Sequence, residues 1–201
     1  MKKADAAIIG FGKGGKTLAG ALAAAGQSVI LIERSEKMYG GTCINVACIP
    51  SKSLHHSACL SAAQGGSFAE KAARYAAAID EKERLTGMLR GKNYHKLADT
   101  ANVTVLDGEA AFLDATHLAV STPEGGEEVE AQKIFINTGA RPFVPPIPGL
   151  QESEYVYLSE GMLELRELPR RMVIIGGGYI GVEFASIYAN FGSQVTMVQD
   201  G

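Results

Sequence analysis

Short apolar runs followed by glycine-rich turns mark both ends of the chain. Near the start, an apolar run over 6–9 is followed by an alanine- and leucine-rich stretch over 16–25 and a second apolar run over 29–32. Continuous apolar runs are typical of strands buried in a parallel sheet, and the stretch between them is typical of a helix. The pattern predicts a strand–helix–strand unit in which Gly26 follows the helix end.

The same order of elements recurs near the other end of the chain. An apolar run over 172–175 precedes a helical pattern over 181–191 and a further apolar run over 195–198. The two segments align without a gap, which places Gly10 on Gly176, Gly12 on Gly178, Gly15 on Gly181 and Gly26 on Gly192. We therefore predict an internal duplication of a nucleotide-binding unit.

The middle of the chain changes from helical to strand-like patterns. Helices are predicted over 51–64 and about 68–98, and we expect them to cover the sheet. A small antiparallel meander is predicted from four short runs, at 103–106, 110–113, 118–121 and 129–136. The proline-rich stretch 142–148 is a predicted linker, which places a domain boundary near Leu150, between domains 1–150 and 151–201.

Charge and hydropathy exclude several classes of protein. A net charge of -3, with both signs mixed along the 201 residues, provides no basic field for nucleic acid. The sequence contains nothing like the roughly 18 consecutive apolar residues of a membrane span. The first apolar run is broken at once by glycines, unlike a secretory signal, so we expect a cytoplasmic protein with neither a nucleic-acid nor a membrane partner.

The first glycine cluster has the spacing and context of a dinucleotide-binding turn. Gly10, Gly12 and Gly15 lie between a predicted strand and a predicted helix, where glycines permit a tight turn and a close approach of pyrophosphate. The start of a helix favours negative charge. Glu33 ends the next strand, where a carboxylate would accept hydrogen bonds from a ribose. The alternative is a glycine-rich turn with an exposed glutamate.

The second cluster, Gly176, Gly178 and Gly181, has the same context, so the chain is predicted to bind two dinucleotides. Gln199 stands where an acidic residue would bind the second ribose. Because Gln199 has no carboxylate, the choice between NADH and NADPH stays open.

Two cysteines five positions apart form the most specific motif. Residues 40–52 read glycine-glycine-threonine-cysteine, four intervening residues, a second cysteine and, one residue later, proline-serine-lysine. Cys43 and Cys48 fall near a predicted helix start, close enough for a disulfide that can open and close. The alternative is half of a zinc site completed by Cys59, His55 and His56, but the usual cysteine spacing for zinc fits poorly. We predict no metal site.

This motif resembles the active-site signature of the class I pyridine nucleotide-disulfide oxidoreductases, which include dihydrolipoamide dehydrogenase, glutathione reductase and mercuric reductase. The segments 10–13 and 38–43 are most similar to the reactive-chlorine-resistance flavoprotein branch, which is linked to hypohalous-type oxidants, hypothiocyanite and copper(II). The resemblance implies an α/β fold: a Rossmann-like FAD-binding domain with an antiparallel meander, then the first strand–helix–strand unit of a Rossmann-like NAD(P)-binding domain. It also implies FAD and either NADH or NADPH as cofactors.

The resemblance also implies roles for individual residues. Cys48 would be the thiolate next to the flavin, and Cys43 the interchange thiol that attacks the substrate. Lys52 would lie near the flavin ring, paired with Glu183, and Tyr179 would cover the flavin until the nicotinamide displaces it. Without the family, surface charge and core packing would explain these last three residues. Further cofactor contacts are implied at Gly41, Thr42, Ala110, Thr138 and Gly139.

The sequence departs from the family at Ala47, where glycine is usual, so an added methyl group could crowd the turn or be harmless. Family members continue for more than this length again, so we expect an N-terminal fragment of a homodimeric enzyme. That enzyme would reduce a disulfide, a metal ion or a reactive oxidant through a Cys43–Cys48 disulfide. The alternative function is a non-catalytic, truncated flavin-binding remnant.

Overall fold

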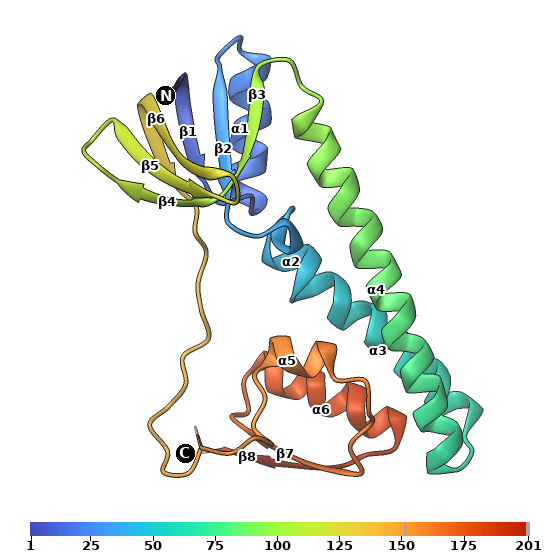
Figure 1. The fold of residues 1–201 in the computed structure, drawn as a ribbon. Coiled ribbons are helices and arrows are strands. Elements are labelled where there is room, and N and C mark those ends of the chain that lie inside the picture. The colour runs from blue at the N-terminus through green and yellow to red at the C-terminus, as the bar shows by residue number, and fades with distance from the viewer. Residues whose placement is uncertain (151, 200–201) are drawn as a thin grey trace. The chain divides into compact units, whose positions relative to one another are not determined.

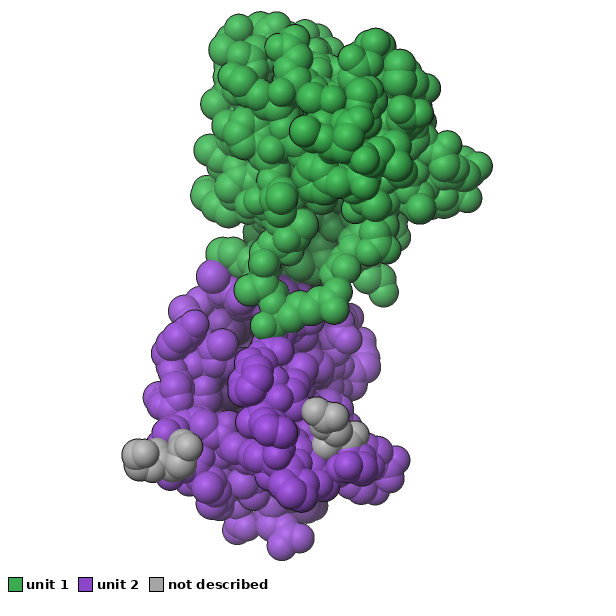
Figure 2. Space-filling view, turned by 90° about the vertical axis from the view of Figure 1, so that its left-hand side faces the viewer, with its two compact units in different colours: residues 1–45, 87–141 green, residues 46–86, 142–201 purple. Residues whose placement is uncertain are grey.

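The computed structural model describes residues 1–150 and 152–199. The chain forms two compact units, one of residues 1–45 and 87–141 and the other of residues 46–86 and 142–201 (Figure 2). The division differs from the predicted domains 1–150 and 151–201, which stay a prediction about cofactor-binding regions. The stretch 142–147 forms neither helix nor strand, as its prolines predict.

The first unit is built on a six-stranded sheet with the order β3-β2-β1-β6-β5-β4 (Figure 1). Its strands are β1 (Lys2–Ile9), β2 (Val29–Glu33), β3 (Val103–Asp107), β4 (Glu109–Phe112), β5 (His117–Thr122) and β6 (Gly125–Ile136). Strands β3, β2, β1 and β6 pair in parallel, whereas β4, β5 and β6 form an antiparallel meander. Because β6 is long, it pairs with both β5 and β1.

One part of the predicted meander is wrong. The run that begins at Val103 is a parallel strand beside β2, with Val103 opposite Val29, and takes no part in the meander. Val103 is buried in the same cluster as Val29 and Leu31. Burial of this apolar strand at the parallel edge therefore outweighs its nearness in sequence to β4.

Alternate residues of the central strands face two different cores. Ile8 and Leu31 pack with helix α1 (Lys13–Ala24) and with Leu97. Ala7 and Ile30 point to the other face, where they pack with side chains of β5 and β6. This alternation is the period of two that a pleated strand imposes.

The second unit packs four helical segments and a short parallel sheet. Its elements are α3 (Cys48–Gln64), the first part of α4 (Phe68–Ala98), α5 (Ser159–Glu164), β7 (Arg171–Ile175), α6 (Tyr179–Phe191) and β8 (Gln194–Val198) (Figure 1). Helix α3 packs on α6 around buried Leu54, Ile187 and Phe191. Helix α3 and the part of α4 before residue 87 belong to this second unit, so the expectation that they cover the first sheet stays a prediction. Helix α3 also begins three residues earlier than predicted, because Pro50 fits within a first helical turn.

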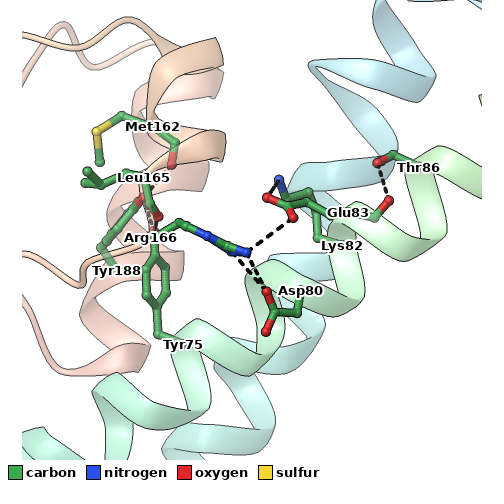
Figure 3. Close-up of polar contacts among 9 residues, drawn as sticks. All are labelled: Tyr75, Asp80, Lys82, Glu83, Thr86, Met162, Leu165, Arg166 and Tyr188. Atoms are coloured by element: carbon green, nitrogen blue, oxygen red, sulfur yellow. Dashed lines mark hydrogen bonds and ion pairs between the residues drawn. The ribbon is translucent and has the colours of Figure 1, made fainter. Parts of the chain in front are cut away.

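Two buried tyrosines, Tyr75 on α4 and Tyr188 on α6, fix the chain around α5. The Tyr75 hydroxyl donates to the carbonyl of Leu165 at 2.6 Å, and the Tyr188 hydroxyl donates to that of Met162 at 2.8 Å (Figure 3). Arg166 continues this contact to Asp80, with nitrogen–oxygen distances of 2.7 and 3.0 Å. The carbonyls of Met162 and Leu165, in the last turn of α5 and at its C-cap, therefore have partners.

Candidate active site

The first glycine turn, between β1 and α1, has a backbone that side chains would disrupt. Gly10 has a φ of 108°, a left-handed conformation that favours glycine, and its N–H donates to the carbonyl of Ile32 at 2.7 Å. A Cβ on Gly15 would collide with the carbonyl oxygen of Gly10. Gly12 caps α1 without a side chain, which leaves the approach to the first-turn N–H groups clear. These features fit a bound pyrophosphate.

Glu33 lies beside this turn at the end of β2. One carboxylate oxygen accepts the N–H of Phe11 at 2.9 Å, and the other accepts the N–H of Ser35 at 3.2 Å. Glu33 is buried, so the alternative of a plain exposed glutamate is wrong. Its role toward a ribose stays a prediction.

The second glycine turn, between β7 and α6, repeats this geometry. Gly176 has a φ of 103°, and its N–H donates to the carbonyl of Val198 at 2.8 Å. A Cβ on Gly181 would collide with the carbonyl oxygen of Gly176. The Gly177 N–H donates to the side-chain oxygen of Gln199, as Phe11 donates to Glu33. The predicted repeat of a strand–helix–strand unit is confirmed down to single hydrogen bonds, and nucleotide binding at both turns stays a prediction.

Asn137 is a site residue that sequence reasoning did not single out. Its side-chain amide donates to the carbonyl of Gly10 at 3.0 Å, and its backbone N–H donates to Ile9 at 2.8 Å. Side chains on Gly12 or Gly14 would crowd this amide. The available signal was its position at the carboxyl end of β6, which is adjacent to β1.

The other predicted flavin contacts fall into two places. Thr138 and Gly139 follow Asn137 directly, and the N–H nitrogen of Thr138 would lie 3.4 Å from a Cβ on Gly10. Ala110 lies apart from them on β4, opposite Val120, and packs against the core of the meander face. Its predicted contact with adenine stays a prediction.

The segment before Cys43 is packed against the first glycine turn. A Cβ on Gly41 would collide with the Cα of Gly12, and Gly41 has a φ of 82°. Helix α2 (Thr42–Asn45) starts at the next residue and carries Cys43, whose side chain is exposed. Tight glycine packing therefore holds Thr42 and Cys43 at the first turn.

Asn45 fixes the shape of this segment. Its side-chain amide donates to the carbonyls of Tyr39 and Gly41 at 3.1 and 2.9 Å, and its oxygen accepts the Nε–H of Arg90 at 2.9 Å. Arg90 lies in the part of α4 that belongs to the first unit. Asn45 and Arg90 are therefore positioning residues that the motif alone did not reveal.

Cys48 is the first residue of α3 and is exposed. It belongs to the second unit, whereas Cys43 belongs to the first, so the pairing of the two thiols stays a prediction. Ala47, which precedes Cys48, has a φ of -142° and a ψ of -101°, outside the helical and extended regions that most residues adopt. The departure from glycine at position 47 therefore coincides with an uncommon backbone conformation.

The predicted pair of Lys52 and Glu183 forms within the second unit. The Lys52 ammonium donates to a carboxylate oxygen of Glu183, and the Ser51 hydroxyl donates to the same oxygen at 3.0 Å. Burial raises the pKa of Glu183, but the hydrogen bonds from Lys52 and Ser51 outweigh burial and hold this pKa below its usual value. Glu183 is thus kept ionised. Tyr179 begins α6 and is 87% exposed, which leaves its ring able to meet a ligand.

The zinc hypothesis has little support in the geometry. Within residues 1–150 and 152–199, no group of three or more histidine, cysteine, aspartate or glutamate side chains could hold a metal ion. The Cys59 sulfur lies 3.8 Å from Nδ1 of His55, one turn away on α3.

Among residues 1–150 and 152–199, no helix is both long and apolar enough to cross a membrane.

Comparisons with known proteins agree with the geometry. A family model described as "Pyridine nucleotide-disulphide oxidoreductase" matches residues 4–201. The probable pyridine nucleotide-disulfide oxidoreductase RclA of Escherichia coli is 52% identical over 199 residues, which are 99% of this chain and 43% of that protein. A mercuric reductase of Streptomyces lividans is 39% identical over 96% of this chain and 42% of its own length.

Solved structures give the same result. The Cu(II) complex of the HOCl-induced flavoprotein disulfide reductase RclA from Escherichia coli matches with a TM-score of 0.89 and 53% identity, over 99% of this chain and 43% of that one. The predicted Rossmann-like α/β fold is confirmed, and the chain spans less than half the length of these relatives. The family and its flavoprotein members use FAD and NAD(P)H. The chain therefore belongs to the pyridine nucleotide-disulphide oxidoreductase family.

Proposed function

We propose that this chain acts within a homodimeric FAD-dependent NAD(P)H oxidoreductase. The enzyme would use a Cys43–Cys48 disulfide to reduce a small-molecule disulfide, a metal ion or a reactive oxidant. The observation that carries this proposal is the repeated glycine turn. In each turn the N–H of the first glycine, Gly10 or Gly176, donates to a carbonyl of the next strand, and its own carbonyl oxygen leaves no room for a Cβ on the glycine five residues later. Two equivalent turns in one chain favour a pair of nucleotide cofactors, between which a hydride can pass.

The first turn would bind FAD. Its backbone N–H groups at the start of α1 face the pyrophosphate, and Glu33 at the end of β2 accepts hydrogen bonds from the ribose. Bound flavin supplies the route by which a hydride from NAD(P)H reduces a disulfide. Thr138 and Gly139 add contacts where β6 ends, beside the same turn.

The second turn would bind NADH or NADPH. Gln199 takes the ribose position, and its amide accepts and donates hydrogen bonds without adding charge. Tyr179 is exposed next to this turn and would cover the flavin until the nicotinamide arrives. Lys52 would present its ammonium to the flavin ring, and its bond to Glu183, which Ser51 also contacts, would hold the ammonium in place.

The two cysteines would divide the work. Cys48, at the first position of α3, would be the sulfur next to the flavin. Cys43, exposed on α2, would attack the substrate. This division is supported by the likeness to the family's relatives and by the exposure of both thiols.

The test is the absorption spectrum of the purified chain after addition of FAD, followed by NADH or NADPH without oxygen. We expect bound flavin to bleach and a long-wavelength thiolate-to-flavin band to appear. Cys48→Ser should abolish this band, and the control Cys59→Ser should keep it. A chain that stays colourless with FAD contradicts the proposal. Bound flavin that NAD(P)H does not reduce favours the alternative, a non-catalytic flavin-binding remnant.

A further inference from the structure

Lys16 is a half-buried cation on the first turn of α1, and its place is fixed by a residue far away in sequence. Its ammonium donates to the side-chain oxygen of Asn93 on α4 at 2.5 Å. The Asn93 amide nitrogen in turn donates to the carbonyl of Leu89 at 2.7 Å. Because only the amide nitrogen can donate to the Leu89 carbonyl, the amide oxygen of Asn93 must face Lys16.

The same two elements enclose the segment that leads to Cys43. A Cβ on Gly40 would lie 3.3 Å from the amide carbon, Cγ, of Asn93. A Cβ on Gly41 would collide with the Cα of Gly12. The segment is therefore packed between α4 and the start of α1, and Cys43 follows two residues later. All of these residues belong to the first unit.

The charge interaction between Lys16 and Cys43 agrees with this packing. Burial lowers the pKa of Lys16, and the nearby Lys13 and Lys96 lower it further, whereas Cys43 raises it. An interaction that favours the charged lysine favours the charged thiolate equally, because the two ionisations are coupled.

We propose that Lys16, held by Asn93, is a positioning charge that stabilises the Cys43 thiolate and keeps this thiol nucleophilic near neutral pH. The inference rests on the proposed role of Cys43 as the thiol that attacks the substrate. When Cys43 ionises, its proton passes to solvent, which reaches the exposed side chain. A nucleophilic thiol needs this charged form.

The other charged groups at this corner do not share the geometry of Lys16. Lys13 and Lys96 are exposed, and Arg90 is bonded to the oxygen of Asn45. The negative charge of Glu36 helps to raise the pKa of Tyr39, whose hydroxyl donates to Asp107. Lys16 thus combines partial burial with a fixed hydrogen bond, and both strengthen its effect on a neighbouring charge.

The experiment measures how fast iodoacetamide alkylates Cys43 in the fully reduced chain across a range of pH, with the modified peptide quantified by mass spectrometry. We expect Lys16→Met to slow alkylation about three- to tenfold at pH 7 and to move the midpoint of the profile to higher pH. Lys16→Arg should retain most of the rate because it keeps the charge. Asn93→Ala should give a smaller loss, since the ammonium remains but is no longer held.

Two controls make the result specific. Lys92→Met removes one exposed cation from α4 and should leave the profile of Cys43 unchanged. Cys59, exposed on α3, is measured in the same digests and should react equally in every variant. If Lys16→Met leaves the Cys43 profile unchanged, or if Lys92→Met shifts it equally, the proposal is overturned.

If Lys16→Met folds poorly, the alkylation rate of Cys43 in Asn93→Ala tests the proposal instead. A Cys43 rate equal to that of the unmodified chain in Asn93→Ala would then overturn the proposal. Alkylation needs no cofactor, so this test can fail while FAD binding and reduction by NAD(P)H succeed. Equally, a chain that binds no FAD can still show the effect of Lys16.

Discussion

Gln199 occupies in the second strand–helix–strand unit the position that Glu33 occupies in the first. Each side chain accepts a hydrogen bond from the backbone N–H of the residue after the first glycine of its turn. The shared contact shows that the side chain at this position holds the glycine turn, in addition to any contact with a ribose. The carboxylate of Glu33 and the amide of Gln199 both accept this hydrogen bond, but only the carboxylate adds negative charge.

This relationship separates the stability of the first turn from its affinity for FAD. Glu33→Gln should lower the free energy of unfolding by only about 0.5–1 kcal/mol, because the amide oxygen still accepts from Phe11 while the Ser35 N–H loses its acceptor. It should weaken FAD binding about tenfold, since a charge-assisted hydrogen bond to the ribose is lost. Urea unfolding and a fluorescence titration with FAD measure the two effects.

Glu33→Ala is the matched comparison and should destabilise the chain by about 1–3 kcal/mol, because the buried N–H of Phe11 loses its partner. Equal stabilities for the alanine and glutamine variants would contradict a structural role for this position.

The glycine turns should be intolerant of even one methyl group. Gly15→Ala forces a Cβ against the carbonyl oxygen of Gly10, so we expect loss of FAD binding and a clear loss of stability. Gly87→Ala is the control, because Gly87 lies within α4 and its Cβ would meet open space. That change should stabilise the chain by about 0.5–1 kcal/mol. Thermal unfolding of both variants decides, and similar midpoints would contradict this account of the turn.

The buried tyrosine pair should make stability depend on high pH. Burial raises the pKa of Tyr188 above its usual value of 10.0, as it raises that of Tyr75. The folded protein therefore holds the phenol proton more tightly than the unfolded chain, so stability should be full below pH 10 and fall as pH rises further. Urea unfolding midpoints across this range measure the effect.

Tyr188→Phe tests the same pair at neutral pH. It removes the hydroxyl that donates to the Met162 carbonyl and should cost about 1–2 kcal/mol. Its stability should also fall less at high pH than that of the unmodified chain. Tyr179→Phe, which alters an exposed hydroxyl, should change neither property. A Tyr188→Phe variant as stable as the unmodified chain would show that the hydroxyl contacts carry no net energy.

Lys52 should control the ionisation of Glu183. The pKa of Glu183 lies below its ordinary value of 4.5, although burial alone would raise it. This pair therefore contributes stability above that pH, and the contribution is lost as pH falls through the lowered pKa. In Lys52→Met we expect the pKa of Glu183 to rise, as followed by the NMR shift of its side-chain carboxyl. An unchanged titration would mean that Ser51 alone keeps this carboxylate ionised.

Patterns over neighbouring residues predicted most of the elements. The apolar runs and glycines predicted both strand–helix–strand units, and helix α4 has the expected bounds of 68–98. Strand β3 was assigned to the wrong partner because an apolar run is compatible with either edge, and its true neighbour lies more than 70 residues earlier. Helix α5 is too short to show a helical period.

The site was predicted best where a motif fixes the backbone. The glycines at 10, 15, 176 and 181 hold the predicted turns, and Lys52 meets Glu183. Asn137, Asn45 and Arg90 were missed because their roles depend on contacts between distant segments, such as the 45 residues that separate Arg90 from Asn45. No local pattern carries that information.

The most direct test of the central claim is the number of electrons that the chain accepts. The flavin-loaded chain is titrated with NADH, and separately with NADPH, in the absence of oxygen. If the flavin and a Cys43–Cys48 disulfide both accept electrons, about two equivalents of reductant should be consumed per flavin, and about one in Cys43→Ser. Equal consumption by the two proteins, or no consumption by either, would contradict a redox-active cysteine pair.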